Sequence, residues 1–334
     1  MKLHGDEACS DRTRSSLLFH TGPPKGAERD DPYELLDSCA TTCEPNGPLC
    51  RYQNERSKNV TRKHLFVGLV VTCVFGTMAS ADDHSWGNYH WARSSNPVAI
   101  ALGNNVDARW DGWLAEASAD WTASAVIDTT IVGGAATGNC KPGDGKVEVC
   151  NAKYGFNNWL GIAQIWVIGD HIIKGAVKLN DSYHDLAPYN QDGWRDLVMC
   201  QEVGHIFGLD HQDENFNNGN LGTCMDYTNY PDASPPNRQP DQSDYNMLAT
   251  IYGHTDGGGS GGSGCKGPVW KCSGAQPPAP AFDMDLQGVG QWGRLISTSR
   301  DGGQSVFVQD FGAGYRVYTH TTWTLEFAAR LARQ

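Results

Sequence analysis

The chain has 334 residues, of which 39% are hydrophobic, and it carries a formal net charge of -12 at pH 7. This length suffices for one sizeable core with appendages or for two domains. The acidic balance argues against a nucleic-acid partner and against an anionic membrane surface, because both favour a basic protein face.

The first recognisable element is a secretory signal over residues 60–81. Arg62-Lys63-His64 is basic, the run from Leu65 to Met78 is mainly apolar, and Ala79-Ser80-Ala81 supplies small residues. This order is typical of a signal peptide, and the run is shorter than the ~20 residues that cross a bilayer. We therefore expect cleavage after Ala81, a secreted protein and no stable membrane span after processing; a membrane anchor is the alternative.

Residues 1–59 precede this signal and are polar, without sustained helical or strand periodicity. We interpret them as a mis-annotated start, with a disordered leader as the alternative. Removal of residues 1–81 leaves an even number of cysteines, which in an exported chain suggests three disulfides. Proximity in the sequence predicts the pairs Cys140–Cys150 and Cys265–Cys272, which leaves Cys200–Cys224.

Residues 82–252 are expected to form one domain of the α/β (α+β) class. Tryptophans and small apolar residues between 110 and 121 recur at helical spacing, and segment 139–151 is expected to be a loop or hairpin. Apolar and β-branched runs predict strands at 98–102, 125–132, 163–168 and 171–179. Strand–helix–strand order followed by further strands predicts a mixed, mostly parallel twisted sheet with helices packed on it.

The next predicted helix begins after Asp192-Gly193 and is apolar on most sides, which is typical of a buried helix. Polar residues on such a helix need partners. Gln201 and His205 are four residues apart, so their side chains lie on the same face and can grip one metal ion. Glu202 lies one step round the helix, where it can act as a general base.

The segment from Gln201 to His211 resembles the metzincin signature H-E-x-x-H-x-x-G-x-x-H, and Cys224-Met225-Asp226-Tyr227 resembles the later Met-turn. The resemblance covers roughly residues 98–230 and is strong only over 194–230. It implies a matrix-metallopeptidase-like zinc endopeptidase that hydrolyses protein or peptide substrates with a metal-activated water. The strand that ends at 177–181 resembles the edge strand that binds extended substrate in this clan.

The resemblance implies a role for each matching residue. Glu202 matches the general base, and His205 and His211 match the second and third zinc ligands. Met225 matches the Met-turn methionine, and Tyr227 resembles a tyrosine that some metzincins place near the metal.

One position departs from the pattern, because Gln201 stands where the first zinc-binding histidine is expected. An amide oxygen is a poorer zinc ligand than an imidazole and is better suited to hard cations. Two hypotheses follow. In the first, the chain is a peptidase, and either Gln201 ligates the metal through its amide oxygen or two histidines suffice. In the second, the chain is a catalytically impaired pseudo-peptidase that acts as an extracellular binding protein.

Other residues give weaker indications. The oxygen-rich loop of Asp213, Glu214, Asn215, Asn217 and Asn218 is a candidate for Ca²⁺, although a solvated acidic loop is the favoured interpretation. His171 and His184 could hold a second metal, but their spacing matches no known pattern and favours surface histidines.

The C-terminal part divides into two segments. Residues 253–281 are rich in glycine and proline and are expected to be a linker. Residues 282–334 are expected to form a small β extension, a meander with strands at 292–297, 305–311 and 315–321. So few strand residues do not make a robust core, so the meander is expected to dock on the catalytic unit, with a binding module as the alternative. The oligomeric state is not indicated.

Overall fold

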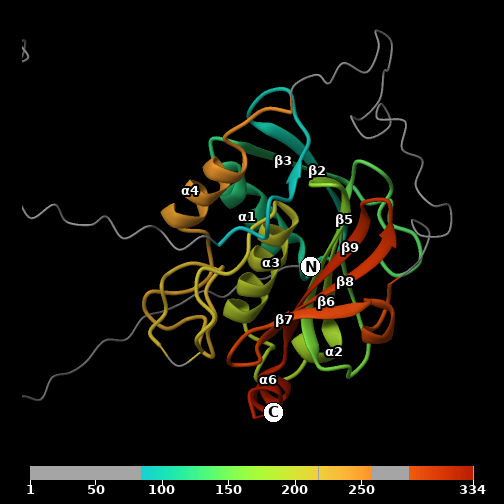
Figure 1. Cartoon of the computed structure of the whole chain (residues 1–334). Helices are drawn as coiled ribbons and strands as arrows, with labels where there is room; N and C mark the ends of the chain where they lie inside the picture. Colours follow the sequence, from blue (N-terminus) through green and yellow to red (C-terminus); the bar gives the residue numbers. More distant parts are fainter. Residues whose placement is uncertain (1–83, 217, 257–285, 334) are drawn as a thin grey trace, which may run out of the picture. The chain divides into compact units, whose positions relative to one another are not determined.

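The computed structural model describes residues 84–216, 218–256 and 286–333 (Figure 1). All described residues belong to one compact unit. The expected leader and signal peptide, Cys265 and Cys272, and most of the expected linker lie outside the described residues.

The described residues form a nine-stranded mixed sheet with strand order β3-β2-β4-β6-β5-β9-β8-β7, and β1 pairs with β6 beside this path. Strands β1, β2, β3, β4 and β6 pair in parallel, whereas β5, β9, β8 and β7 continue the sheet in antiparallel pairs. The bounds are β1 (His90–Trp91), β2 (Val98–Asn105), β3 (Ile127–Gly133), β4 (Val147–Ala152), β5 (Trp159–Ile168), β6 (His171–Asn180), β7 (Arg294–Thr298), β8 (Gln304–Gly312) and β9 (Tyr315–Trp323).

The helices are α1 (Asp111–Thr122), α2 (Asp181–His184), α3 (Asp192–Ile206), α4 (Gln242–Ile251) and α6 (Leu325–Leu331), with a short 3-10 helix, η1 (Val289–Gln291). Figure 1 shows α1 and α3 side by side against one face of the sheet. Every residue of α3 from Asp196 to Ile206 is buried. The predicted mixed sheet with a buried helix and a C-terminal meander is therefore confirmed. Among the described residues no helix is long and apolar enough to cross a membrane.

Each face of the sheet carries its own apolar cluster, because successive strand residues point to opposite faces. In β9, Tyr318 belongs to the cluster shared with α1 and α3, whereas Val317 and Trp323 belong to the second cluster. The second cluster joins residues of β4, β5, β6, β8, β9 and the segment around η1, and its largest members include Trp159, Trp166, Trp292 and Phe307. The meander thus shares both apolar clusters with the rest of the sheet.

Two sequence-based predictions are wrong. Segment 139–151 is not simply a loop, because its last residues enter β4, which lies between β2 and β6. The strand was not recognised because the charged residue Glu148 interrupts its apolar run, although its side chain is buried in the structure. The Glu148 carboxylate accepts hydrogen bonds from Asn105 Nδ2 (2.6 Å) and from the Ala135 backbone N–H (3.0 Å). Strand β6 is not an edge strand, because β4 pairs with one side of it and β5 with the other. Strand order depends on long-range pairing, which local sequence does not specify.

Two disulfides link the described residues, Cys140–Cys150 and Cys200–Cys224. They correspond to two of the three expected pairs. The first joins the loop before β4 to that strand. The second joins α3 to the segment that contains Met225, so it connects two parts of the candidate site.

Candidate metal centre

The histidines of the candidate site come from the end of α3 and the turn after it. His205 lies in the last turn of α3, and Gly208 adopts a φ of +93°, where an added Cβ would lie 2.1 Å from the Tyr89 carbonyl oxygen. Only glycine fits such a close approach at this backbone angle. The turn returns His211 to His205, and their Nε2 atoms are 2.9 Å apart. Both side chains are buried.

Hydrogen bonding shows which ring nitrogens carry protons. His205 Nδ1 lies 2.8 Å from the Leu209 carbonyl oxygen, which can only accept, so Nδ1 donates and Nε2 of the neutral ring has a lone pair. The Gln304 amide nitrogen lies 2.7 Å from His211 Nε2 and can only donate, so that Nε2 carries no proton; its lone pair accepts this hydrogen bond, which a metal ion on His211 would replace. Two lone pairs that face each other at 2.9 Å repel unless a cation lies with them. These residues therefore fit a metal ion.

Gln201 fixes the orientation of the Gln304 amide. Gln201 Nε2 donates to the Cys224 carbonyl oxygen at 2.8 Å, which directs its Oε1 the other way. That oxygen accepts from Gln304 Nε2 at 3.2 Å and lies 3.1 Å from Thr322 Oγ1, whose single hydrogen goes to Glu202 at the shorter distance of 2.7 Å. The residue that replaces the expected first histidine is thus engaged in a buried hydrogen-bond network with the C-terminal meander.

A third histidine, His320 of β9, completes the cluster. Its ring stacks on that of His205, and the candidate ligand atoms of His205, His211 and His320 all lie within 4.8 Å of one another. One ring nitrogen lies 3.4 Å from Asp210 Oδ1. His320 belongs to no local motif and was not predicted from the sequence. The available signal was strand alternation, which places this histidine, the only one in residues 282–334, on the same face as Tyr318 and Thr322.

Glu202 is fully buried between α3 and the sheet. Its Oε1 accepts a hydrogen bond from Thr322 Oγ1 at 2.7 Å, and Oε2 has no hydrogen-bond partner among the described residues. Burial raises the pKa of Glu202 to about 8, although the hydrogen bond from Thr322 lowers it. A cation on the neighbouring imidazoles would lower this pKa further, because it stabilises the carboxylate.

Met225 and Tyr227, the residues of the expected Met-turn, are both buried. An added Cβ on Gly204 of α3 would lie 2.8 Å from Met225 Sδ, so the methionine packs directly against the helix. The ring of Tyr227 meets that of His211 edge-on, with 4.3 Å between their centroids, so the tyrosine supports this histidine through packing. The roles that the resemblance implies for Met225 and Tyr227 stay predictions.

The C-terminal meander closes the site. β9 pairs with β5 along its whole length, from Trp159 opposite Trp323 to Ile168 opposite Tyr315. The N-terminal segment adds a second cover, because Trp86 meets the His320 ring edge-on at 4.7 Å. In this arrangement the carboxylate and the imidazoles do not face solvent.

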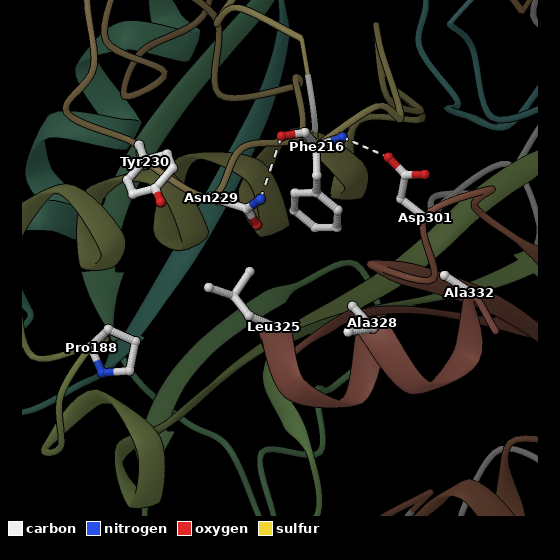
Figure 2. Close-up of a pocket in the computed structure, with 9 residues that line it drawn as sticks. Pro188, Phe216, Asn229, Tyr230, Asp301, Leu325, Ala328 and Ala332 are labelled. Carbon is white, nitrogen blue, oxygen red and sulfur yellow. Dashed lines mark hydrogen bonds between the residues drawn. The ribbon is translucent and has the colours of Figure 1, made fainter.

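The loop after His211 is hydrogen-bonded to the C-terminal segment and packs against it (Figure 2). The Phe216 backbone N–H donates to Asp301 Oδ2 at 2.8 Å, and its ring fills the space beside Gly303, where an added Cβ would lie 2.1 Å from it. A cavity of about 580 Å³ separates this loop from α6, with Leu325 on its floor. None of the histidines or Glu202 lines this cavity.

The weaker candidates have different outcomes. Asp213 Oδ1 accepts from the Asn215 backbone N–H within the oxygen-rich loop, Asn217 lies outside the described residues, and the Ca²⁺ hypothesis stays a prediction. His184 is fully buried and meets Trp110 edge-on, so its interpretation as a surface histidine is wrong. His171 is partly exposed and contacts other potential ligands, as described below.

The fold and the site together define an α/β protein with a candidate metal centre on a buried helix. No family model and no curated protein matches the chain. Among solved structures, the structure of myroilysin matches 51% of this chain and 98% of that chain, with 12% sequence identity and a TM-score of 0.31. A similarity at this level says nothing about activity, so function has to be inferred from the residues.

Proposed function

We propose that the chain is a metal-dependent peptidase with a zinc ion on His205, His211 and His320. The observation that carries the proposal is the pair of Nε2 lone pairs of His205 and His211 at 2.9 Å. Burial is the main cause that lowers the pKa of both rings, which favours the neutral form that binds metals. Three imidazole ligands are typical of a zinc site that keeps a further position open.

A zinc ion in this place would supply Lewis-acid chemistry, since it polarises a carbonyl group and acidifies water. Glu202 is the proposed general base. In the closed form its Oε1 is held by Thr322, whereas Oε2, without a partner among the described residues, is the atom that would take the proton from the attacking water once β9 has left. Gln201 is a positioning residue of the closed form, in which it orients Gln304.

The described arrangement corresponds to a closed form of this peptidase. An extended peptide binds a sheet by adding a strand to a free edge, but β9 already pairs with β5 beside the catalytic residues. A substrate therefore requires β9 to leave, and His320 leaves with it. In this proposal His320 would hold the metal in the closed form only, and His205 and His211 would hold it after β9 has left.

A second candidate function is an extracellular binding protein with an impaired site. The full burial of Glu202 and His205 favours it, because a permanently closed metal centre only stabilises the fold. Both candidates agree with secretion. Disulfides such as Cys140–Cys150 and Cys200–Cys224 are typical of exported proteins, and they support the signal peptide proposed at residues 60–81.

Nicking the chain between the two parts of the sheet tests the proposal. A full-length variant carries a recognition sequence for a specific protease within residues 257–281. The intact connection keeps the meander at a high effective concentration near the rest of the sheet, so cutting the connection makes dissociation of the meander more favourable. We expect the zinc-loaded chain to cleave a denatured protein faster after the cut. The matched nicked Glu202→Gln variant should be at least about 100-fold slower, the usual scale of general-base effects. Equal rates in both nicked, zinc-loaded proteins would favour the binding protein.

A further inference from the structure

Four potential metal ligands meet at a second place, far from Glu202 in the sequence and on different elements. His90 of β1 and His171 of β6 are register partners, and His254 and Asp256 follow α4. The Nε2 atoms of His90 and His171 lie 3.1 and 3.0 Å from Asp256 Oδ1. His254 Nε2 lies 3.6 Å from the same oxygen and 3.3 Å from His90 Nε2.

The separations among these atoms are close to those around a tetrahedral ion. Zinc binds imidazole nitrogen at ~2.0–2.1 Å, so the corners of its tetrahedron are ~3.3–3.4 Å apart. The four separations above lie between 3.0 and 3.6 Å and scatter around that value. His90, His254 and Asp256 present ligand atoms that all lie within 4.8 Å of one another, and His171 joins them through Asp256. Three imidazoles and one carboxylate are a ligand set that suits zinc better than magnesium or calcium.

The hydrogen bonds of His90 also favour a cation in the cluster. His90 Nδ1 lies 2.6 Å from the Asn88 carbonyl oxygen, so it donates, and Nε2 of the neutral ring presents a lone pair. This lone pair faces the Asp256 carboxylate and the ring nitrogen of His254. Without a metal, this lone pair can accept only the hydrogen of His254 Nε2, at 3.3 Å, and it still faces the Asp256 carboxylate at 3.1 Å; a metal ion would pair with both. A backbone carbonyl that fixes the far nitrogen is the usual support of a metal-bound histidine.

The carboxylate is held in place by the N-terminal segment. Asp256 Oδ2 accepts a hydrogen bond from the Arg93 backbone N–H at 2.9 Å, and the Asp256 N–H donates to the Arg93 carbonyl oxygen at 3.0 Å. Oδ1 is thereby directed to the histidines. A cavity lined by His90 and His254 adjoins the cluster and offers a path for an ion.

We propose that His90, His171, His254 and Asp256 form a second, structural zinc site. Four protein ligands leave no open position, which distinguishes a structural site from a catalytic one. The ion would join the N-terminal segment, the start of β6 and the chain after α4. Asp256 directly precedes the glycine-rich stretch that begins at Gly257. The site would therefore hold the chain in place just before that stretch. The site does not depend on the proposed peptidase function.

Zinc stoichiometry of the full chain tests the proposal. We expect two zinc ions per wild-type chain and one in the His171→Ala/His254→Ala variant, whose affinity at this site should fall at least about 100-fold, since two ligands are lost. The matched control, His205→Ala/His211→Ala, should retain the ion at this second site. Because His171 and His254 have 33% and 56% exposed side chains, their truncation leaves the core intact.

The outcomes separate the two sites. A single wild-type ion that disappears only in His205→Ala/His211→Ala overturns the second site and leaves the proposed function standing. A single ion that disappears only in His171→Ala/His254→Ala does the reverse. Anomalous scattering at the zinc edge from crystals of the wild-type chain gives an independent measurement. A peak between the four side chains supports the site, and its absence from zinc-loaded crystals overturns it.

Discussion

The imidazole of His320 stacks on the imidazole of His205, with 3.8 Å between the ring centroids and 14° between the ring planes. His205 belongs to α3 and His320 to β9, so the contact joins the helix that resembles the metzincin signature to the C-terminal meander. It places a third imidazole beside the two that the sequence identified.

Removal of the third imidazole should weaken metal binding. We expect His320→Ala to lower zinc affinity of the closed chain by at least about tenfold, because even changes in the groups around metal ligands have effects of that size. Tyr318→Phe is the matched control, since it changes the same strand face but removes only a hydroxyl that bonds Tyr89. Titration with zinc measures both. Equal affinities in wild type and His320→Ala would show that His320 does not ligate.

A histidine at position 201 should compensate for that loss. Residues 201 and 205 lie one helical turn apart on the same face, so Gln201→His presents an imidazole from the side of His205. We expect the double variant Gln201→His/His320→Ala to regain at least about tenfold in zinc affinity over His320→Ala. Zinc titration of the three proteins decides the matter. If the double variant binds no better than His320→Ala, position 201 does not reach the ion.

The close approach of β5 to Glu202 should make Gly161 intolerant of a side chain. An added Cβ would lie 2.5 Å from both Glu202 Oε1 and Val198 Cγ1. We expect Gly161→Ala to destabilise the protein by about 1–3 kcal/mol through overpacking. Gly143→Ala is the control, because no described atom lies within 4 Å of its added Cβ, and about 0.5 kcal/mol or less is expected. Urea unfolding compares the two, and a neutral Gly161→Ala would contradict the packing.

Stability should fall in acid partly through His184. Burial lowers the pKa of His184 from 6.5 to about 4. Between these values the unfolded chain binds a proton that the folded chain excludes, so stability present above pH 6.5 is lost as pH falls toward 4. Protonation of His184 alone accounts for a loss of roughly 3 kcal/mol in the free energy of unfolding over this pH range. Urea unfolding of metal-free protein at pH 7 and pH 4 should show a correspondingly smaller loss for His184→Gln. An identical loss in both proteins would mean that His184 is protonated in the fold.

Local patterns in the sequence were sufficient for most elements and for part of the site. The apolar sides of α3 predicted a buried helix, and the spacing of Gln201, Glu202 and His205 placed all three on it. Proximity predicted Cys140–Cys150, and elimination then paired Cys200 with Cys224. These inferences succeeded because helical periodicity and short disulfide loops depend on residues close in the chain.

Only the tertiary structure decided which strands are neighbours and which distant residues complete the two clusters. Local sequence does not encode that β6 is internal, that β9 pairs with β5, or that His320 reaches His205. The same holds for His90, His171, His254 and Asp256, which come from three separate segments. The sequence determined which chemical groups α3 carries on each face, because these residues belong to one helix and follow its periodicity. Strand pairing decided the rest, because it brings together residues whose separation in the chain carries no periodic signal.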